Sequence, residues 1–126
     1  MRVFKVKGFA CFQRRERIAD TLLARAVRAA EDGLIGADLG GGLVKQRVAR
    51  VGQGKSGGFR TVIAYRRGDR AIFLLGFAKS ERDNVGDDEL DELKGLARGF
   101  LRLSLDRIEA LAALDELTEV TYDEDE

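Results

Sequence analysis

The basic residues in the middle of the chain are the first candidates for chemistry. Residues 43–66 contain six Lys or Arg and no Asp or Glu. A solvated surface normally mixes both signs of charge, so this composition favours a surface that binds phosphate groups. Residues 1–82 contain 18 Lys and Arg against 7 Asp and Glu, whereas residues 83–126 contain 4 against 15. The formal net charge of zero therefore hides a basic body with an acidic end, which is typical of proteins that bind polyanions.

The composition also excludes several kinds of site. The 126 residues include no histidine and a single cysteine, Cys11. Catalysis by Ser-His-Asp or Cys-His, zinc sites with His ligands and the His pair of ordinary ribonucleases are therefore ruled out. We expect no metal and no cofactor. We also expect a cytoplasmic protein without a membrane partner, because one cysteine forms no internal disulfide and neither a secretory signal nor an apolar run of about 20 residues is visible.

Residues 49–56 satisfy a relaxed phosphate-loop pattern, with Ala in place of the first glycine. A true phosphate loop opens a helix whose N-terminal amides hold the phosphates. Here residues 59–65 follow instead, and they are rich in the aromatic and β-branched residues that favour a strand. We therefore interpret the match as accidental. Its glycines still leave amides exposed beside Lys55, which suits a nucleic-acid phosphate.

Strands are expected to position the basic residues. Short runs with alternating or continuous apolar residues predict four of them, at residues 3–7, 43–50, 59–66 and 71–79. The last two flank a tight hairpin turn at residues 67–70. The strand at 71–79 is apolar on both faces, so we expect it in the centre of the sheet.

Helical patterns surround these strands. Residues 9–17 and 20–31 predict two helices in a hairpin, with Gly33 ending the second one. A further helix is expected to start at residues 87–89, whose carboxylates favour a helix N-terminus, and another is expected at residues 105–117. The order of elements predicts an α+β domain with its helices on one face of an antiparallel sheet.

Side chains alternate along a strand, which places Lys45 and Arg47 on one face. Arg60 lies near the start of the next strand, and Lys79 and Arg82 lie at the end of the third. If these strands pair, their cationic groups can converge on one open face of the sheet.

Three segments around these residues resemble the RelE/ParE toxin superfamily, and most closely its HigB-like branch. They are Gly-Gly-Gly-Leu-Val-Lys-Gln-Arg-Val-Ala-Arg at 40–50, Gly-Lys-Ser-Gly-Gly-Phe-Arg-Thr at 54–61 and Gly-Phe-Ala-Lys-Ser-Glu-Arg-Asp-Asn at 76–84. The resemblance implies a helical hairpin on a curved antiparallel sheet of about four strands, followed by C-terminal helices. It also implies a toxin of a type II toxin–antitoxin system, which cleaves mRNA on the ribosome and is silenced by a cognate antitoxin protein.

The family motifs carry over to individual positions. Lys45 and Arg47 match a Lys-x-Lys-like strand pair, and Arg60 matches the Arg of a Gly-Tyr-Arg motif. Arg82 matches the Arg of a Lys-x-Glu-Arg motif that begins at Lys79. Gly86 stands where some members have a tyrosine, so a step that depends on tyrosine has no counterpart here. The matched region implies a toxin domain at residues 1–103 and a helical extension with an acidic tail at residues 104–126.

The implied reaction is attack of an RNA 2′-hydroxyl on the adjacent phosphate. Without histidine, the base could be a lysine that loses its proton readily beside other cations, and Lys45 and Lys55 are both candidates. Arginines hold phosphate oxygens in a bidentate manner, a role that fits Arg60 and Arg82. The remaining cations expected to bind RNA are Arg47, Arg50 and Lys79.

Two other functions remain open on the sequence alone. One is a ParE-like inhibitor of DNA gyrase, which would share the fold but which generally lacks such converging basic residues. The other is a catalytically inactive regulator that binds nucleic acid.

Overall fold

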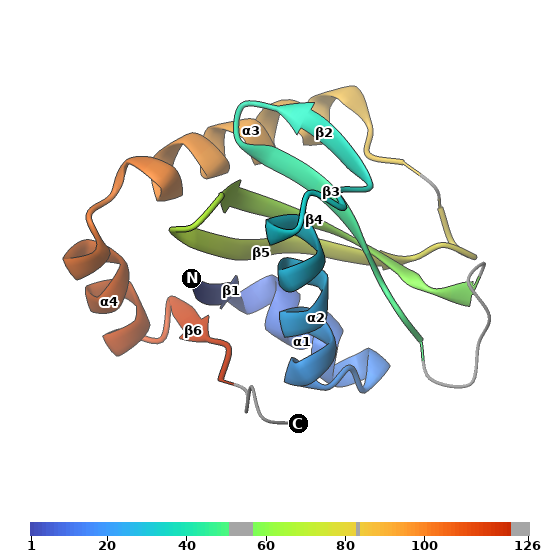
Figure 1. The fold of residues 1–126 in the computed structure, drawn as a ribbon, viewed down its shortest axis with the longest axis horizontal. Coiled ribbons are helices and arrows are strands. Elements are labelled where there is room, and N and C mark those ends of the chain that lie inside the picture. The colour runs from blue at the N-terminus through green and yellow to red at the C-terminus, as the bar shows by residue number, and fades with distance from the viewer. Residues whose placement is uncertain (51–56, 83, 122–126) are drawn as a thin grey trace.

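A computed structural model describes residues 1–50, 57–82 and 84–121. It consists of a mixed sheet with helices on both faces (Figure 1). The elements in chain order are β1 (Arg2–Val6), α1 (Lys7–Glu16), α2 (Asp20–Glu31), β2 (Ala37–Gly40), β3 (Leu43–Val48), β4 (Phe59–Arg66), β5 (Arg70–Ala78), α3 (Asp87–Arg102), α4 (Leu105–Ala113) and β6 (Leu117–Glu119).

The sheet has the strand order β2-β3-β4-β5-β1-β6. β5 lies between β4 and β1, which confirms the expected central strand. The prediction of about four antiparallel strands is wrong, because six strands pair and β1 runs parallel to β5. The two additional strands, β2 and β6, form the edges and contain only four and three residues. Segments this short carry too few alternations to be recognised from hydrophobic pattern.

Helices cover both faces of the sheet, and the prediction that they share one face is also wrong. Residues of α1 and α2 form one buried cluster with Val44, Phe59 and Phe73. Residues of α3 and α4 form a second cluster with Phe4 and Val62. Both clusters exist because the central strands are apolar on both sides, and each side needs its own cover.

The two N-terminal helices lie on different strands. α1 packs against β5 and β1, whereas α2 packs against β3, so the predicted hairpin is not matched in detail. α1 covers Gly76 of β5 with the ring of Phe12. A Cβ atom at position 76 would lie 2.4 Å from that ring, so only glycine lets the helix approach this closely.

The helix expected to start at residues 87–89 is present as α3, which buries Leu93 and Ala97. The buried Arg70 guanidinium holds the end of α3 by donating to the carbonyls of Phe100 and Leu103 at 3.0 and 2.6 Å. α4 ends at Ala113 and not at residue 117, because the chain turns there and pairs as β6 with β1. The acidic residues 122–126 lie outside the described residues.

Candidate functional site

Two arginines and one aromatic ring align across β3, β4 and β5, and a third arginine lies over the ring. Arg47 is the register partner of Arg60, and Arg60 is the register partner of Phe77. Directly paired residues project from the same face of a sheet, and this face carries α3. The Arg82 guanidinium lies over the Phe77 ring, 4.5 Å from its centroid. We call Arg47, Arg60, Phe77 and Arg82 the basic row.

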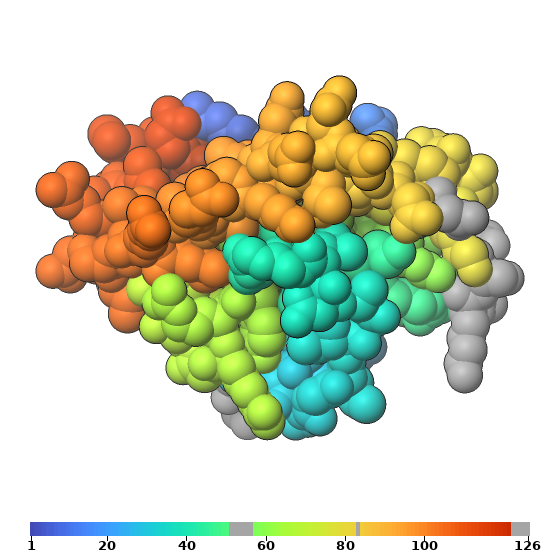
Figure 2. Space-filling view, turned by 90° about the horizontal axis from the view of Figure 1, so that it is seen from above, coloured from blue at the N-terminus to red at the C-terminus, as the bar shows by residue number. Residues whose placement is uncertain are grey.

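Lys45 joins the row from the same face of β3. Its Nζ atom donates a hydrogen bond to Oδ1 of Asn84 at 3.1 Å. Asn84 belongs to the segment that leads from β5 to α3, which Figure 2 shows at one end of the helix in yellow. The structure therefore brings together four of the residues singled out from the sequence: Lys45, Arg47, Arg60 and Arg82.

An acidic residue of α3 contacts the row. Nη1 and Nη2 of Arg82 donate to Oε1 and Oε2 of Glu89 at 2.8 and 3.3 Å. Both side chains are partly exposed, at 38% for Arg82 and 36% for Glu89. The guanidinium is thus held between an aromatic face and a carboxylate, and water still reaches it.

A glycine determines where the Arg47 guanidinium lies. A Cβ atom at position 58 would be 3.1 Å from Nε and 3.3 Å from Cζ of Arg47. These distances are shorter than ordinary van der Waals contact, so a larger residue would displace the guanidinium. Gly58 is the second glycine of the Gly-Gly-Phe-Arg segment, and its lack of a side chain leaves room for the Val48 carbonyl, 3.0 Å from such a Cβ, and for the Arg47 side chain on the neighbouring strand.

The structure separates Arg50 from the basic row. Its guanidinium lies 5.3 Å from the ring centroid of Phe59, and Phe59 belongs to the core on the α1 and α2 face. Lys79 is half-buried at the start of the turn after β5, where its amide donates to the Gly58 carbonyl at 3.3 Å. Lys55, the second candidate base, lies outside the described residues.

Sequence reasoning missed three further residues of the site. Phe77 supports Arg82, Asn84 accepts from Lys45, and Glu89 pairs with Arg82. Phe77 and Asn84 lie within the segment at 76–84 that carried the resemblance, but no strand pattern indicates a side-chain contact. The sequence pattern identifies Glu89 only as one of the carboxylates that favour a helix N-terminus, and it gives no sign of the contact with Arg82.

The row suits the binding of phosphate groups. Arginine presents a planar fork of N–H donors that matches phosphate oxygens. Arg47 and Arg60 lie on the adjacent strands β3 and β4, and Arg82, which follows β5, lies over Phe77 of that strand. Phe77 is buried beneath Arg82, which fixes the plane of that fork. Within residues 1–50, 57–82 and 84–121, no group of three or more His, Cys, Asp or Glu could hold a metal ion.

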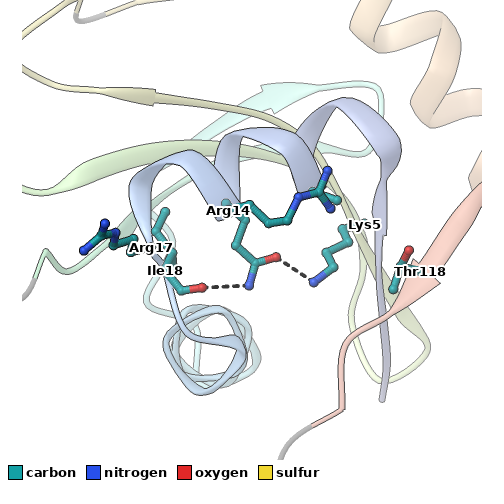
Figure 3. Close-up of a pocket in the computed structure, with 7 residues that line it drawn as sticks. Lys5, Arg14, Arg17, Ile18 and Thr118 are labelled. Atoms are coloured by element: carbon teal, nitrogen blue, oxygen red, sulfur yellow. Dashed lines mark hydrogen bonds between the residues drawn. The ribbon is translucent and has the colours of Figure 1, made fainter.

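A second polar cluster lies on the opposite face of the sheet. Lys5 of β1 is buried, and its Nζ donates to Oε1 of Gln13 at 2.6 Å and to Oδ1 of Asp20 at 3.1 Å. Nε2 of Gln13 donates to the same Asp20 oxygen and to the Ile18 carbonyl. Figure 3 shows the two hydrogen bonds through which the Gln13 side chain links Lys5 to the Ile18 carbonyl, beside a pocket of about 330 Å³. We call Lys5, Gln13 and Asp20 the buried network.

The fold and the row together define a small α+β protein with a row of cationic side chains on one face of its sheet. The family model of the RelE toxin of the RelE / RelB toxin-antitoxin system matches residues 1–120. The chain therefore belongs to the RelE toxin family, and this membership implies an antitoxin as its partner. A search of curated proteins found no match. None of the helices in the described part of the chain is long and apolar enough to cross a membrane.

Proposed function

We propose that the protein is a ribosome-dependent mRNA interferase of the HigB-like branch, acting in the cytoplasm and silenced by its antitoxin. The observation that carries this proposal is the alignment of Arg47, Arg60 and Arg82 with Lys45 on one face of the sheet. Family membership supports the role of toxin.

The proposed reaction needs three kinds of group. The RNA 2′-oxygen forms a bond to phosphorus while the bond from phosphorus to the 5′-oxygen breaks, which leaves a cyclic phosphate and a 5′-hydroxyl. Lys45 or Lys55 takes the proton from the 2′-hydroxyl, and an acid returns a proton to the 5′-oxygen. Arg60 and Arg82 stabilise the negative charge that builds on the phosphate oxygens. Arg47 and Lys79 bind the flanking RNA, whereas Arg50, beside Phe59 on the opposite face of the sheet, is given no part in the reaction.

The chemistry of the row supports dependence on the ribosome. The row offers charge but, without histidine, no strong acid–base pair, so the message must be held in the reactive geometry by another body. Positioning of this kind contributes large rate factors by removing the entropy cost of alignment.

The decisive test uses a translation extract with a defined message. Ribosome-dependent cleavage, mapped by primer extension, is the expected result. Inhibition of DNA supercoiling by gyrase without cleavage would instead select a ParE-like function. RNA binding without either activity would select an inactive regulator. The antitoxin should abolish the activity when added to the extract.

The base is tested by replacing each candidate lysine with arginine. Lys45→Arg and Lys55→Arg keep the positive charge but remove a group that can exchange a proton near neutral pH. We expect one of the two variants to lose cleavage while its binding to ribosomes persists. Full activity in both variants would eliminate a lysine base.

A further inference from the structure

The Arg82 guanidinium already holds an anion in the free protein. Glu89 contacts it through both carboxylate oxygens, at 2.8 and 3.3 Å from the two terminal nitrogens. This two-point geometry is also how a guanidinium holds two oxygens of a phosphate group. One donor edge of Arg82 therefore faces a carboxylate from its own chain.

We propose that Glu89 occupies the phosphate-binding position on Arg82 until substrate arrives, and so competes with the substrate phosphate. The inference rests on the proposed function, since it assigns Arg82 to a substrate phosphate. On binding, the phosphate replaces the carboxylate on the guanidinium fork, and no covalent bond changes.

The exchange requires little energy. Both side chains are more than a third exposed, and ion pairs this exposed contribute little to stability because water and salt screen them. The guanidinium also lies over the Phe77 ring, 4.5 Å from its centroid, a contact that does not involve the carboxylate. Glu89 also lies in the first turn of α3, where the unpaired backbone amides favour a carboxylate after it leaves Arg82.

The neighbouring acid Glu92 provides a matched control. It lies three residues further along the same helix and is exposed. Glu92 has no ion pair among the described residues, unlike Glu89. Glu89→Gln and Glu92→Gln therefore remove the same charge from the same helix, but only the first removes a competitor for Arg82.

The experiment measures how the full-length variants bind ribosomes programmed with a message that carries 2′-deoxyribose at the cleavage position. We expect Glu89→Gln to bind about 2- to 5-fold more tightly at low salt, the range of one exposed ion pair. KM for the normal message should fall by the same factor with kcat unchanged. The gain should vanish in an Arg82→Ala background and should shrink as salt rises. Glu92→Gln should match the wild type.

Two outcomes would overturn the inference: unchanged binding by Glu89→Gln, or an equal gain for Glu92→Gln. A titration with a short single-stranded RNA, followed by the NMR signal of Arg82 Nε, separates this inference from the proposed function. If no variant binds or cleaves on ribosomes, the proposed function fails. The RNA titration then decides whether Glu89 competes with phosphate: a lower midpoint for Glu89→Gln supports the competition, and an unchanged midpoint rejects it.

Discussion

The buried network and the basic row place positive charge on opposite faces of one sheet, and they differ in how far the charge is exposed to solvent. Lys5 is 9% exposed, and its ammonium contacts an amide and a carboxylate from α1 and α2. Arg82 is 38% exposed, and its carboxylate partner comes from an equally exposed position. One cation is enclosed by the fold, whereas the other remains within reach of solvent.

The difference follows from the cost of removing a charge from water. A buried ammonium without partners is destabilising, so Lys5 must keep Gln13 and Asp20 permanently. A half-exposed guanidinium retains part of its hydration and can exchange one anion for another. Charge of the first kind holds elements together, and charge of the second kind is available for a ligand. The comparison predicts that variants of the two clusters fail in different assays.

The largest effect is expected for Arg60→Ala. Loss of a donor that stabilises charge in the transition state costs about 10²-fold or more in rate, so ribosome-dependent cleavage should fall by at least that factor. The free energy of unfolding should change by no more than about 0.5 kcal/mol, since Arg60 is only half-buried. Cleavage kinetics and urea denaturation measure the two quantities.

Arg50→Ala is the matched control for this prediction. It removes the same charge from the opposite face of the sheet, beside Phe59. We expect a loss in cleavage of less than about 5-fold, typical of a screened, distant charge. Equal losses in the two variants would show that overall charge matters and that the row as a geometric unit does not.

Alternation explains how much of this row could be predicted from the sequence. It places Lys45 and Arg47 on one face of a strand. It also places Arg50 on the other face, because Arg50 follows Arg47 by three positions, an odd number. The partner of Arg60 depends on register, which no local pattern specifies. The register of β4 and β5 moreover shifts between Val62 and Ile63, so counting from the hairpin turn would misplace Phe77.

The central strands could also be predicted from the sequence, whereas the edge strands could not. β4 and β5 are long, apolar and joined by a turn in which Gly68 has φ 73°, so each signal supports the others. β6 contains only Leu117, Thr118 and Glu119 and forms because β1 offers a free edge. Its pairing is decided by residues more than 100 positions away, which a local reading of the sequence does not contain.

Asp20→Asn should damage the buried network without affecting the row. The change leaves the Lys5 ammonium with a neutral partner in a buried place, and we expect a loss of about 2 kcal/mol in the free energy of unfolding. Cleavage per folded molecule should remain at the wild-type level. Urea denaturation followed by circular dichroism gives the first quantity. A loss of cleavage without a loss of stability would reverse the roles assigned to the two clusters.

Gly58→Ala tests whether the placement of Arg47 matters. The added methyl group would lie 3.0 Å from the Val48 carbonyl oxygen and 3.1 and 3.3 Å from Nε and Cζ of Arg47, so it displaces the flexible guanidinium and also presses on the β3 backbone. We expect cleavage to fall about 10-fold, because small misplacements of a positioning group are costly. Gly86→Ala is the control, since no atom lies within 4 Å of a Cβ there. Equal activity of both variants would show that the Arg47 position is not critical.

The smallest effect is expected at a contact remote from the row, where Glu31 of α2 accepts hydrogen bonds from the Tyr65 hydroxyl and the Gly68 amide. The Tyr65 hydrogen bond is the main cause that lowers the pKa of Glu31. A carboxylate with a lowered pKa stabilises the fold above its unfolded pKa of about 4.3, and this contribution is lost as pH falls through the folded pKa. Tyr65→Phe should therefore cost about 1 kcal/mol at pH 7, and the difference from the wild type should shrink below about pH 4.

Chemical denaturation of both proteins at pH 7 and at pH 3.5 measures this difference, with cleavage as a second readout. Burial also raises the pKa of the Tyr65 hydroxyl, so the wild type should lose its advantage again as pH rises above about 10. Cleavage at neutral pH should be unchanged, because the contact lies at the other end of β4 from Arg60. A stability difference that stays constant from pH 7 to pH 3.5 would show that the tyrosine acts through packing and not through the Glu31 carboxylate.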